Sequence, residues 1–297
     1  MVEIDQTNLR GNMLHNESMQ KHTSWRVGGK ADCYYQPADI SDLALLLSQL
    51  PEDEQITWVG LGSNLLVRDN GIRGTVIATN GVLKTLETVG SDFVRAEAGV
   101  ACAKVARFCA KQGFVGAEFL AGIPGTIGGA LAMNAGAFGG EMWDIVSSVA
   151  SLNRQGQLFE RQPENYQIGY RSVKGPADEW FVAATIKLDR GDTQASMQKI
   201  KGLLAKRSDT QPTSLPNAGS VFRNPEGDFS ARLIEKCGLK GKCEGHACVS
   251  EKHANFIINT GGAKAADIER LISRVQESVE KECGVRLECE VRIVGEA

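Results

Sequence analysis

Two glycine-rich loops carry the clearest chemical signal in this sequence of 297 residues. The first is the segment GLGSN at 60–64, and the second belongs to a stretch, 116–140, in which eight of twenty-five residues are glycine. Glycine lets main-chain N–H groups come close to an anion, and Ser63 and Asn64 add side-chain donors. The loops predict a phosphate site, although a strand-to-strand turn also explains the first, and a glycine-packed helix with tight turns also explains the second.

Positive charge is missing around the second loop. No Lys or Arg occurs from Gln112 through Asn153. A P-loop needs the lysine of its GK[ST] motif, and a GxGxxG dinucleotide site needs an acidic residue after its second strand, so neither motif fits. A kinase or ATPase is therefore excluded. Any phosphate at this loop would be bound by main-chain N–H groups and by a helix N-terminus near Thr126.

Charge and composition exclude other classes of protein. Thirty-three Lys and Arg against thirty-six Asp and Glu leave a formal net charge of −3, and 42% of the residues are hydrophobic. Without a long-range positive field we expect neither nucleic acid nor a membrane as a partner, and nothing points to an obligate protein partner. No apolar run is long enough to cross a bilayer, and residues 1–10 lack the features of an export signal. We therefore expect a cytoplasmic protein.

Eight cysteines are present, with no CxxC pair and no framework of the secreted kind, so we expect all of them to be reduced thiols. One group, Cys237, Cys243 and Cys248 with His246 and His253, contains residue types that bind zinc. Its cysteine spacings of five and four intervening residues are poor for a zinc knuckle, which usually needs at least one tight C-x2-4-C pair. We expect free thiols there and no metal.

The elements expected around these residues alternate between helix and strand. Helices are predicted at 40–50, 101–112, 193–207, 230–237 and 264–282. Strands are predicted at 31–36, 56–59, in short runs between 65 and 98, and at 145–152, 180–188, 254–259 and 285–293. A long irregular connection at 211–227 is a place where function tends to concentrate. The pattern indicates an α+β protein whose residues from about 208 form a small α+β domain.

Seven segments recur in order over nearly the whole chain: WRVGG at 25–29, GLGSNLL at 60–66, GIPGTIGGALAMNAGA at 122–137, YRS at 170–172, NAGSVFRNP at 217–225, SEKHANFIIN at 250–259 and LECEVRIVG at 287–295. Together they resemble the UDP-N-acetylenolpyruvoylglucosamine reductase family of bacterial cell-wall precursor synthesis. The resemblance implies a two-lobed FAD-binding domain of the vanillyl-alcohol-oxidase or PCMH type, with lobes at 1–75 and 76–207. A C-terminal α+β substrate domain at 208–297 follows, whose last strand contributes to the active site. The short length resembles the compact type II form of the family.

The resemblance also implies a bound FAD whose pyrophosphate lies against the two glycine loops. The implied contacts are Gly60, Gly62, Ser63, Asn64, Leu65, Gly122, Ile123, Pro124, Gly125, Thr126, Ile127, Gly129, Asn134, Ala135 and Gly136. Arg207 is implied as a countercharge from the side. A diphosphate bound by N–H dipoles needs no lysine, which accounts for the stretch without positive charge.

A reaction is implied as well. NADPH would reduce FAD, hydride would pass from flavin N5 to C3 of the enolpyruvyl group of UDP-N-acetylglucosamine enolpyruvate, and a proton would add at C2 to give UDP-N-acetylmuramate. Arg171 would grip the substrate carboxylate in two-point geometry, Glu290 would donate a hydrogen bond as a neutral acid, and Ser220 would deliver the proton. The residues implied in binding the rest of the substrate are Asn217, Arg223, Asn224 and Asn255.

Two other interpretations remain open. Another FAD enzyme of the same fold, a sugar or hydroxy-acid oxidase, would often attach its flavin through a histidine, but all four histidines lie outside the glycine loops. Flavin that stays on acid-precipitated protein would favour the oxidase. A non-catalytic nucleotide-binding module would lack one of Arg171, Ser220 or Glu290, and this sequence has all three.

Overall fold

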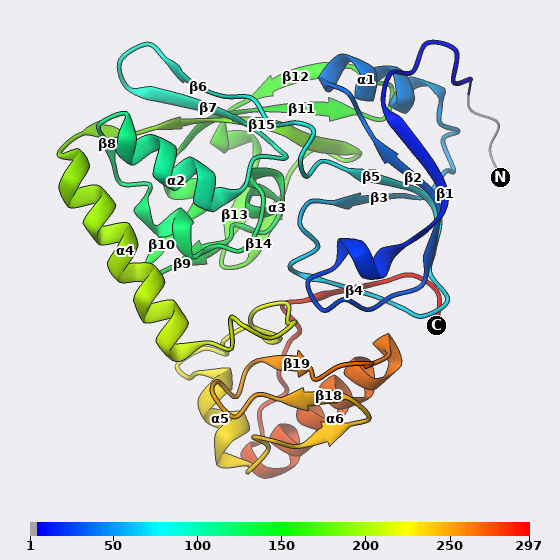
Figure 1. Ribbon diagram of the computed structural model, residues 1–297, viewed down its shortest axis with the longest axis vertical. Helices are drawn as coiled ribbons and strands as arrows, with labels where there is room; N and C mark the ends of the chain where they lie inside the picture. Colours follow the sequence, from blue (N-terminus) through cyan, green and yellow to red (C-terminus); the bar gives the residue numbers. More distant parts are fainter. Residues whose placement is uncertain (1–4) are drawn as a thin grey trace. The chain divides into compact units, whose positions relative to one another are not determined.

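The computed structural model describes residues 5–297, which fold into two compact units (Figure 1). Unit 1 contains 5–15, Cys33–Leu61 and Gly74–Ala205, and unit 2 contains Asn16–Asp32, Gly62–Arg73 and Lys206–Ala297. Each unit is therefore built from segments that are far apart in the sequence. The mixture of helices and strands confirms the predicted α+β class.

The main sheet of unit 1 has five strands in the order β12-β11-β15-β7-β6, with antiparallel pairing throughout. These strands are β6 (Leu86–Val89), β7 (Phe93–Glu97), β11 (Val146–Asn153), β12 (Leu158–Arg161) and β15 (Glu179–Lys187). In the middle of the sheet Ala184 lies opposite both Val149 and Ala96. All three side chains belong to one buried apolar core.

The helix α2 (Cys102–Lys111) covers this core because its apolar residues follow helical spacing. Cys102, Val105, Ala106 and Cys109 lie on one face and are almost fully buried. Gly113, which follows the helix, has a φ of +75°, a conformation that glycine adopts without strain. The structure confirms the predicted helix and its glycine stop.

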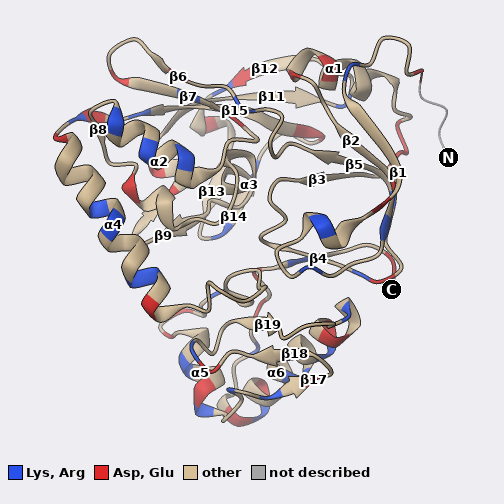
Figure 2. Ribbon diagram, in the orientation of Figure 1, with Lys and Arg blue, Asp and Glu red and all other residues tan. Residues whose placement is uncertain are grey.

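The helix α3 (Ile127–Met133) follows the second glycine loop in the same core. Figure 2 shows α3 and the short strand β9 (Gly136–Ala137) entirely in tan, because neither contains a charged residue. Asn134 ends the helix in the left-handed conformation, with a φ of 47°. This turn directs the chain from α3 into β9.

The N-terminal part of the chain forms a four-stranded sheet in the order β1-β2-β5-β3. Its strands are β1 (Asn12–Ser18), β2 (Lys30–Gln36), β3 (Ile56–Val59) and β5 (Ile72–Ala78), and β3 and β5 pair in parallel. The helix α1 (Ile40–Gln49) is capped by Asp39, whose side chain accepts a hydrogen bond from the N–H of Asp42. The helix and the strands β2, β3 and β5 occur where the sequence predicted them, whereas β1 was not predicted.

In unit 2 the long helix α6 (Ala265–Cys283) buries one apolar face. Its buried residues Ile268, Leu271, Ile272, Val275 and Val279 are at most 2% exposed, as the predicted periodicity requires. They pack in one core with residues of α5 (Ser230–Lys236) and of the antiparallel sheet β17-β18-β19, whose strands are Cys243–Glu244, Ala247–Val249 and Ile257–Asn259. The two helices lie close to their predicted positions, and the boundary of the small domain stays a prediction.

The end of the chain differs from the prediction of one strand at 285–293. Only β20 (Arg292–Val294) is a strand, and it pairs in parallel with β4 (Leu65–Val67). Before it, Cys289 forms a single bridge with Phe222. The alternating apolar pattern was misleading because this stretch pairs with a short loop instead of a full strand.

The remaining elements are short, apart from α4. The helix α4 (Thr193–Thr210) extends three residues beyond its predicted end. The short elements are η1 (Met19–His22), β8 (Phe114–Val115), η2 (Glu118–Gly122), β10 (Gly140–Glu141), η3 (Met142–Asp144), η4 (Pro163–Asn165), β13 (Gln167–Gly169), β14 (Ser172–Lys174) and β16 (Asp189–Arg190). Within residues 5–297, no helix combines the length and the apolar character that a membrane span requires.

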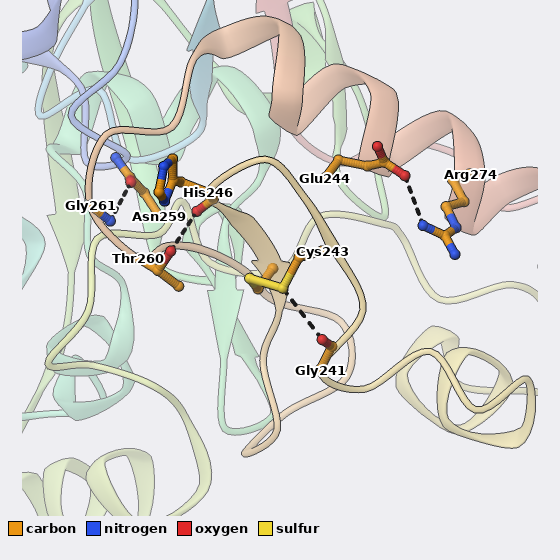
Figure 3. The surroundings of a disulfide bond; sticks show 9 residues. Gly241, Cys243, Glu244, His246, Asn259, Thr260, Gly261 and Arg274 are labelled. Atoms are coloured by element: carbon orange, nitrogen blue, oxygen red, sulfur yellow. Dashed lines mark hydrogen bonds and ion pairs between the residues drawn. A yellow bond between two sulfur atoms is a disulfide. The ribbon is translucent and has the colours of Figure 1, made fainter.

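One cysteine pair corrects the prediction that all eight cysteines are free thiols. Cys243 and Cys248 form a disulfide bond between β17 and β18 (Figure 3). They lie directly opposite each other in the antiparallel register, with their Cα atoms 4.1 Å apart, which the spacing alone did not reveal. Within the described chain the other six cysteines form no disulfide bond, and no group of three or more His, Cys, Asp or Glu is arranged to hold a metal ion.

Candidate functional site

In unit 1 the end of β3 comes very close to the second glycine loop. A Cβ atom added to Gly60 would lie 2.4 Å from Oγ1 of Thr126, so no side chain fits there. Thr126 is 1% exposed, and its hydroxyl has no hydrogen-bond partner among the described residues. A buried polar atom without a partner costs free energy, which a polar ligand group can recover.

The first two N–H groups of α3 are both hydrogen-bonded within the chain. The N–H of Ile127 donates to the carbonyl of Val100 at 2.9 Å, and the N–H of Gly128 donates to that of Ala98 at 2.9 Å. The N–H of Ile127 is thus engaged within the chain, and the implied contact of Ile127 with FAD stays a prediction. Thr126 supplies the polar atom at this point of the loop instead.

The rest of the first glycine loop belongs to unit 2, where its conformation serves the chain itself. Gly62 has a φ of +61°, and a Cβ atom there would lie 2.0 Å from the carbonyl oxygen of His22. Asn64 donates from Nδ2 to the carbonyl of Glu290 at 3.0 Å, and its own carbonyl accepts from the N–H of Arg292 at 2.9 Å. Asn64 thus holds the segment that carries a predicted catalytic residue.

Arg207, the predicted countercharge, is a partly buried cation of unit 2. Its Nε donates to Oε1 of Gln211 at 3.1 Å, and no carboxylate within residues 5–297 forms an ion pair with it. Burial lowers the pKa of the Arg207 guanidinium. An anionic ligand would stabilise the charged form, so this residue fits the role that the resemblance implies.

Arg171 lies in unit 1 at the turn between β13 and β14, where Gly169 pairs with Ser172. Its φ of +52° is unusual for a residue with a long side chain. The guanidinium donates from Nη1 to the carbonyl of Asn134 at 3.3 Å and from Nη2 to that of Gly136 at 3.1 Å. Glu141 adds a carboxylate oxygen 3.7 Å from Nη1.

Ser220 and Glu290 come together in unit 2 through main-chain hydrogen bonds. The N–H of Glu290 donates to the carbonyl of Val221 at 2.8 Å, and the N–H of Arg223 donates to that of Glu288 at 2.9 Å. The loop that carries Ser220 therefore runs beside the segment that carries Glu290. Both residues are half-buried.

The comparisons with known proteins agree with the resemblance seen in the sequence. A family model described as the UDP-N-acetylenolpyruvoylglucosamine reductase C-terminal domain matches residues 211–294, and one described as an FAD binding domain matches 31–161. A UDP-N-acetylenolpyruvoylglucosamine reductase of Methylococcus capsulatus is 60% identical over 288 residues, covering 97% of this chain and 95% of that protein. This chain belongs to the UDP-N-acetylenolpyruvoylglucosamine reductase family.

Further relatives agree with this membership. The reductase of Nitrosococcus oceani is 55% identical over 296 residues, covering 100% of this chain and 99% of that protein. The crystal structure of the reductase (MurB) from Thermus caldophilus has a TM-score of 0.83 at 31% identity, covering 96% of this chain and 99% of that one. The predicted fold, an FAD-binding domain followed by a C-terminal domain of this family, is confirmed.

Two of the predicted substrate residues use their side-chain amides for hydrogen bonds to the main chain of unit 2. Asn255 accepts from the N–H of Phe222 at 3.0 Å and donates to its carbonyl at 2.8 Å. Asn217 donates to the carbonyls of Pro212 and Leu215 and accepts from the N–H of Gly219. Both amides hold the loop that carries Ser220, so the structure gives them a positioning task.

The other two predicted substrate residues lie further along the same loop. Asn224 is exposed, and its Oδ1 accepts from the N–H of Ser230 at the start of α5. Arg223 lies with Nη1 3.9 Å from a carboxylate oxygen of the exposed Glu288. A long ion pair with a solvated carboxylate is weak.

One residue that the sequence analysis did not select is Glu141. Its carboxylate accepts from Nδ2 of Asn134 at 2.8 Å and lies near Arg171. The only signal in the sequence is its position at the end of the second glycine loop, in the stretch without Lys or Arg. Its partner Arg171 is thirty positions further along the chain, so no local pattern could pair them.

Proposed function

We propose that this protein reduces the enolpyruvyl group of UDP-N-acetylglucosamine enolpyruvate to give UDP-N-acetylmuramate, with NADPH as the reductant and FAD as the cofactor. The activity is that of a UDP-N-acetylmuramate dehydrogenase in peptidoglycan precursor synthesis. The observation that carries the proposal is a match over nearly the whole chain to proteins named UDP-N-acetylenolpyruvoylglucosamine reductase. Arg171, Ser220 and Glu290 are all present in the family's motifs.

The residues of the second glycine loop fit an FAD diphosphate. Thr126 has a buried hydroxyl without a hydrogen-bond partner in the described chain. Gly60 places no side chain next to this hydroxyl. Arg207 would add a positive charge. FAD, when bound, supplies the hydride chemistry. The other implied contacts of the two glycine loops remain predictions.

The substrate requires a cation and a proton donor from the chain. Arg171 would bind the carboxylate next to the double bond, because a planar guanidinium matches a carboxylate in two-point geometry. Ser220 would deliver the proton to C2. Glu290 would donate a hydrogen bond to the same carboxylate and so stabilise the negative charge that develops there. Arg223 and Asn224 would bind the diphosphate of the nucleotide.

The proposal also includes the domain boundaries predicted from the sequence. Residues 1–75 and 76–207 would form the two FAD-binding lobes, and 208–297 the substrate domain. The family models fall within this division, since the FAD binding domain matches 31–161 and the C-terminal domain matches 211–294. Asn217 and Asn255 would act through the loop that they hold.

The test is the visible spectrum of the purified protein under anaerobic conditions. A yellow protein that NADPH bleaches and that the enolpyruvyl sugar nucleotide recolours would support the proposal. The control is the same experiment with UDP-N-acetylglucosamine, which lacks the enolpyruvyl double bond and should leave the flavin reduced. Flavin that remains on acid-precipitated protein, or bleaching by a sugar or hydroxy acid instead of NADPH, would favour the oxidase interpretation.

A further inference from the structure

The surroundings of Arg171 are more elaborate than a carboxylate-binding side chain at a turn needs. Its backbone adopts a φ of +52°, where a non-glycine residue is strained. Its side chain is nevertheless largely buried, at 16% exposure, and its guanidinium donates to two main-chain carbonyls. Strain of this kind persists only where the surrounding structure enforces it.

Glu141 is the acidic member of these surroundings. Its Oε1 lies 3.7 Å from Nη1 of Arg171, while its Oε2 accepts from Nδ2 of Asn134 at 2.8 Å. Asn134 in turn accepts on Oδ1 from the N–H of Trp143 at 3.1 Å and is 2% exposed. Asn134 therefore fixes the position of the Glu141 carboxylate independently of its contact with Arg171.

Gly136 makes this approach possible. It lies directly opposite Glu141 in the pairing of β9 and β10. A Cβ atom at Gly136 would lie 3.1 Å from Nη1 of Arg171, 3.1 Å from Cγ of Glu141 and 2.7 Å from the carbonyl oxygen of Gly140. The absence of a side chain thus serves the arginine and the glutamate.

We propose that Glu141 is a positioning residue, which together with Asn134 and Gly136 fixes the guanidinium of Arg171 for the substrate carboxylate. This inference rests on the proposed function. It also gives Asn134 and Gly136, which the resemblance assigned to FAD, a task toward the substrate. Proper placement matters because an error of about 1 Å in a reacting group can cost on the order of 10²-fold in rate.

The first test is Glu141→Gln, which removes the charge but keeps the shape. We expect the FAD content and the rate of bleaching by NADPH to stay within about twofold of the wild-type values. Reoxidation by the enolpyruvyl nucleotide should slow by about 10- to 100-fold, with a raised KM for that nucleotide but not for NADPH. Glu141→Asp, which keeps the charge at a shorter reach, should recover part of the loss.

Asp144→Asn is the matched control. Asp144 is the last residue of the short helix η3, which Glu141 caps, and it accepts from the N–H of Glu141 at 2.8 Å; asparagine can accept the same bond. The variant keeps this hydrogen bond and removes a neighbouring negative charge, and we expect both half-reactions to keep wild-type rates. A similar selective loss in Asp144→Asn would overturn the proposal, because the loss of any negative charge at this turn would then explain the effect.

A double-mutant cycle decides whether Glu141 acts through Arg171. Once Arg171 is replaced by alanine, Glu141→Gln should cause no further slowing of reoxidation, since the group that it positions is gone. Independent, multiplicative losses would overturn the proposal, as would equal slowing of both half-reactions in the single variant. If the wild-type protein is not reoxidised by the enolpyruvyl nucleotide, the proposed function itself fails and takes this inference with it.

Discussion

The two regions that carry the predicted catalytic residues are built in different ways. In unit 1, Arg171 is held through side-chain atoms, by two carbonyls and a carboxylate, on a strained turn. In unit 2, Ser220 and Glu290 are brought together by main-chain hydrogen bonds such as the one from Glu290 N to Val221 O. Substituting Arg171 or Glu141 should therefore disturb the geometry of the first region, whereas substituting Ser220 or Glu290 should leave the main-chain bonds of the second intact.

The largest effect is expected for Ser220→Ala. The loop is held by its main chain and by Asn217 and Asn255, so the variant should fold normally. Bleaching by NADPH should stay near normal, whereas reoxidation by the enolpyruvyl nucleotide should slow by about 10²- to 10⁴-fold, as is typical when a positioned acid is lost. Rapid mixing measures both steps. Ser220→Cys should recover part of the rate, and fast reoxidation without the hydroxyl would remove Ser220 from the role of proton donor.

Arg171→Lys tests the side-chain dependence of the first region. A lysine ammonium cannot donate to two carbonyls and also grip a carboxylate in two-point geometry. We expect reoxidation to slow by about 10²-fold, with normal FAD content and normal bleaching by NADPH. Single-turnover mixing gives the rate, and the thermal midpoint serves as the folding control. Near-normal reoxidation would show that Arg171 is structural.

Thr126→Val probes the unsatisfied hydroxyl of unit 1. Valine keeps the shape and removes a buried polar atom that has no partner within the described chain, so the flavin-free protein should gain about 1 kcal/mol in its free energy of unfolding. If FAD satisfies this hydroxyl, its affinity should fall about tenfold. Urea unfolding of flavin-free protein and a fluorescence titration with FAD measure the two effects.

Thr75→Val is the matched control for that experiment. Thr75 is equally buried in unit 1, but its hydroxyl donates to Glu54 at 2.7 Å. The control should therefore lose stability and keep its FAD affinity. If Thr126→Val also loses stability without weakening FAD binding, the fit of Thr126 to the cofactor is wrong.

The smallest effect concerns acid stability in unit 1. Burial acts to raise the pKa of Glu118, but hydrogen bonds from Ser196 and Lys199 outweigh it and hold the pKa below its usual value of 4.5. A carboxyl with a lowered folded-state pKa stabilises the protein above the unfolded-state value and loses this contribution as the pH falls through the folded-state value. Glu118→Gln should thus cost about 1–2 kcal/mol at pH 7 and less at pH 3.5. Urea unfolding at both pH values checks the sign, and a cost that grows on acidification would contradict it.

Local patterns predicted much of the fold. The apolar residues of α6 recur at helical spacing, and the structure buries them, because a regular helix alone determines which positions share a face. Gly113 ends α2 for an equally local reason, its positive φ. The segment 285–291 was predicted wrongly because strand formation depends on a partner, and its partner here is a short loop.

The candidate site was predictable in its residue types but not in its connections. The family motifs pointed to Arg171, Ser220 and Glu290, whereas Glu141 carried no pattern of its own. Gly62 illustrates a further difficulty, since the sequence suggested a close approach to a ligand and the structure shows a close approach to His22. A glycine in the sequence can indicate that another group comes close, but it does not show whether that group is a ligand or another part of the chain.

By itself the sequence determined the family, the α+β class and the long helices, since motifs and periodicity are properties of contiguous residues. Only the tertiary structure decided which remote residues meet. Glu290 and Val221, Arg171 and Gly136, and the two cysteines of the disulfide are paired by strand register and packing. The physical reason is that a hydrogen bond between distant segments depends on how whole elements pack, and residue identity alone leaves that choice open.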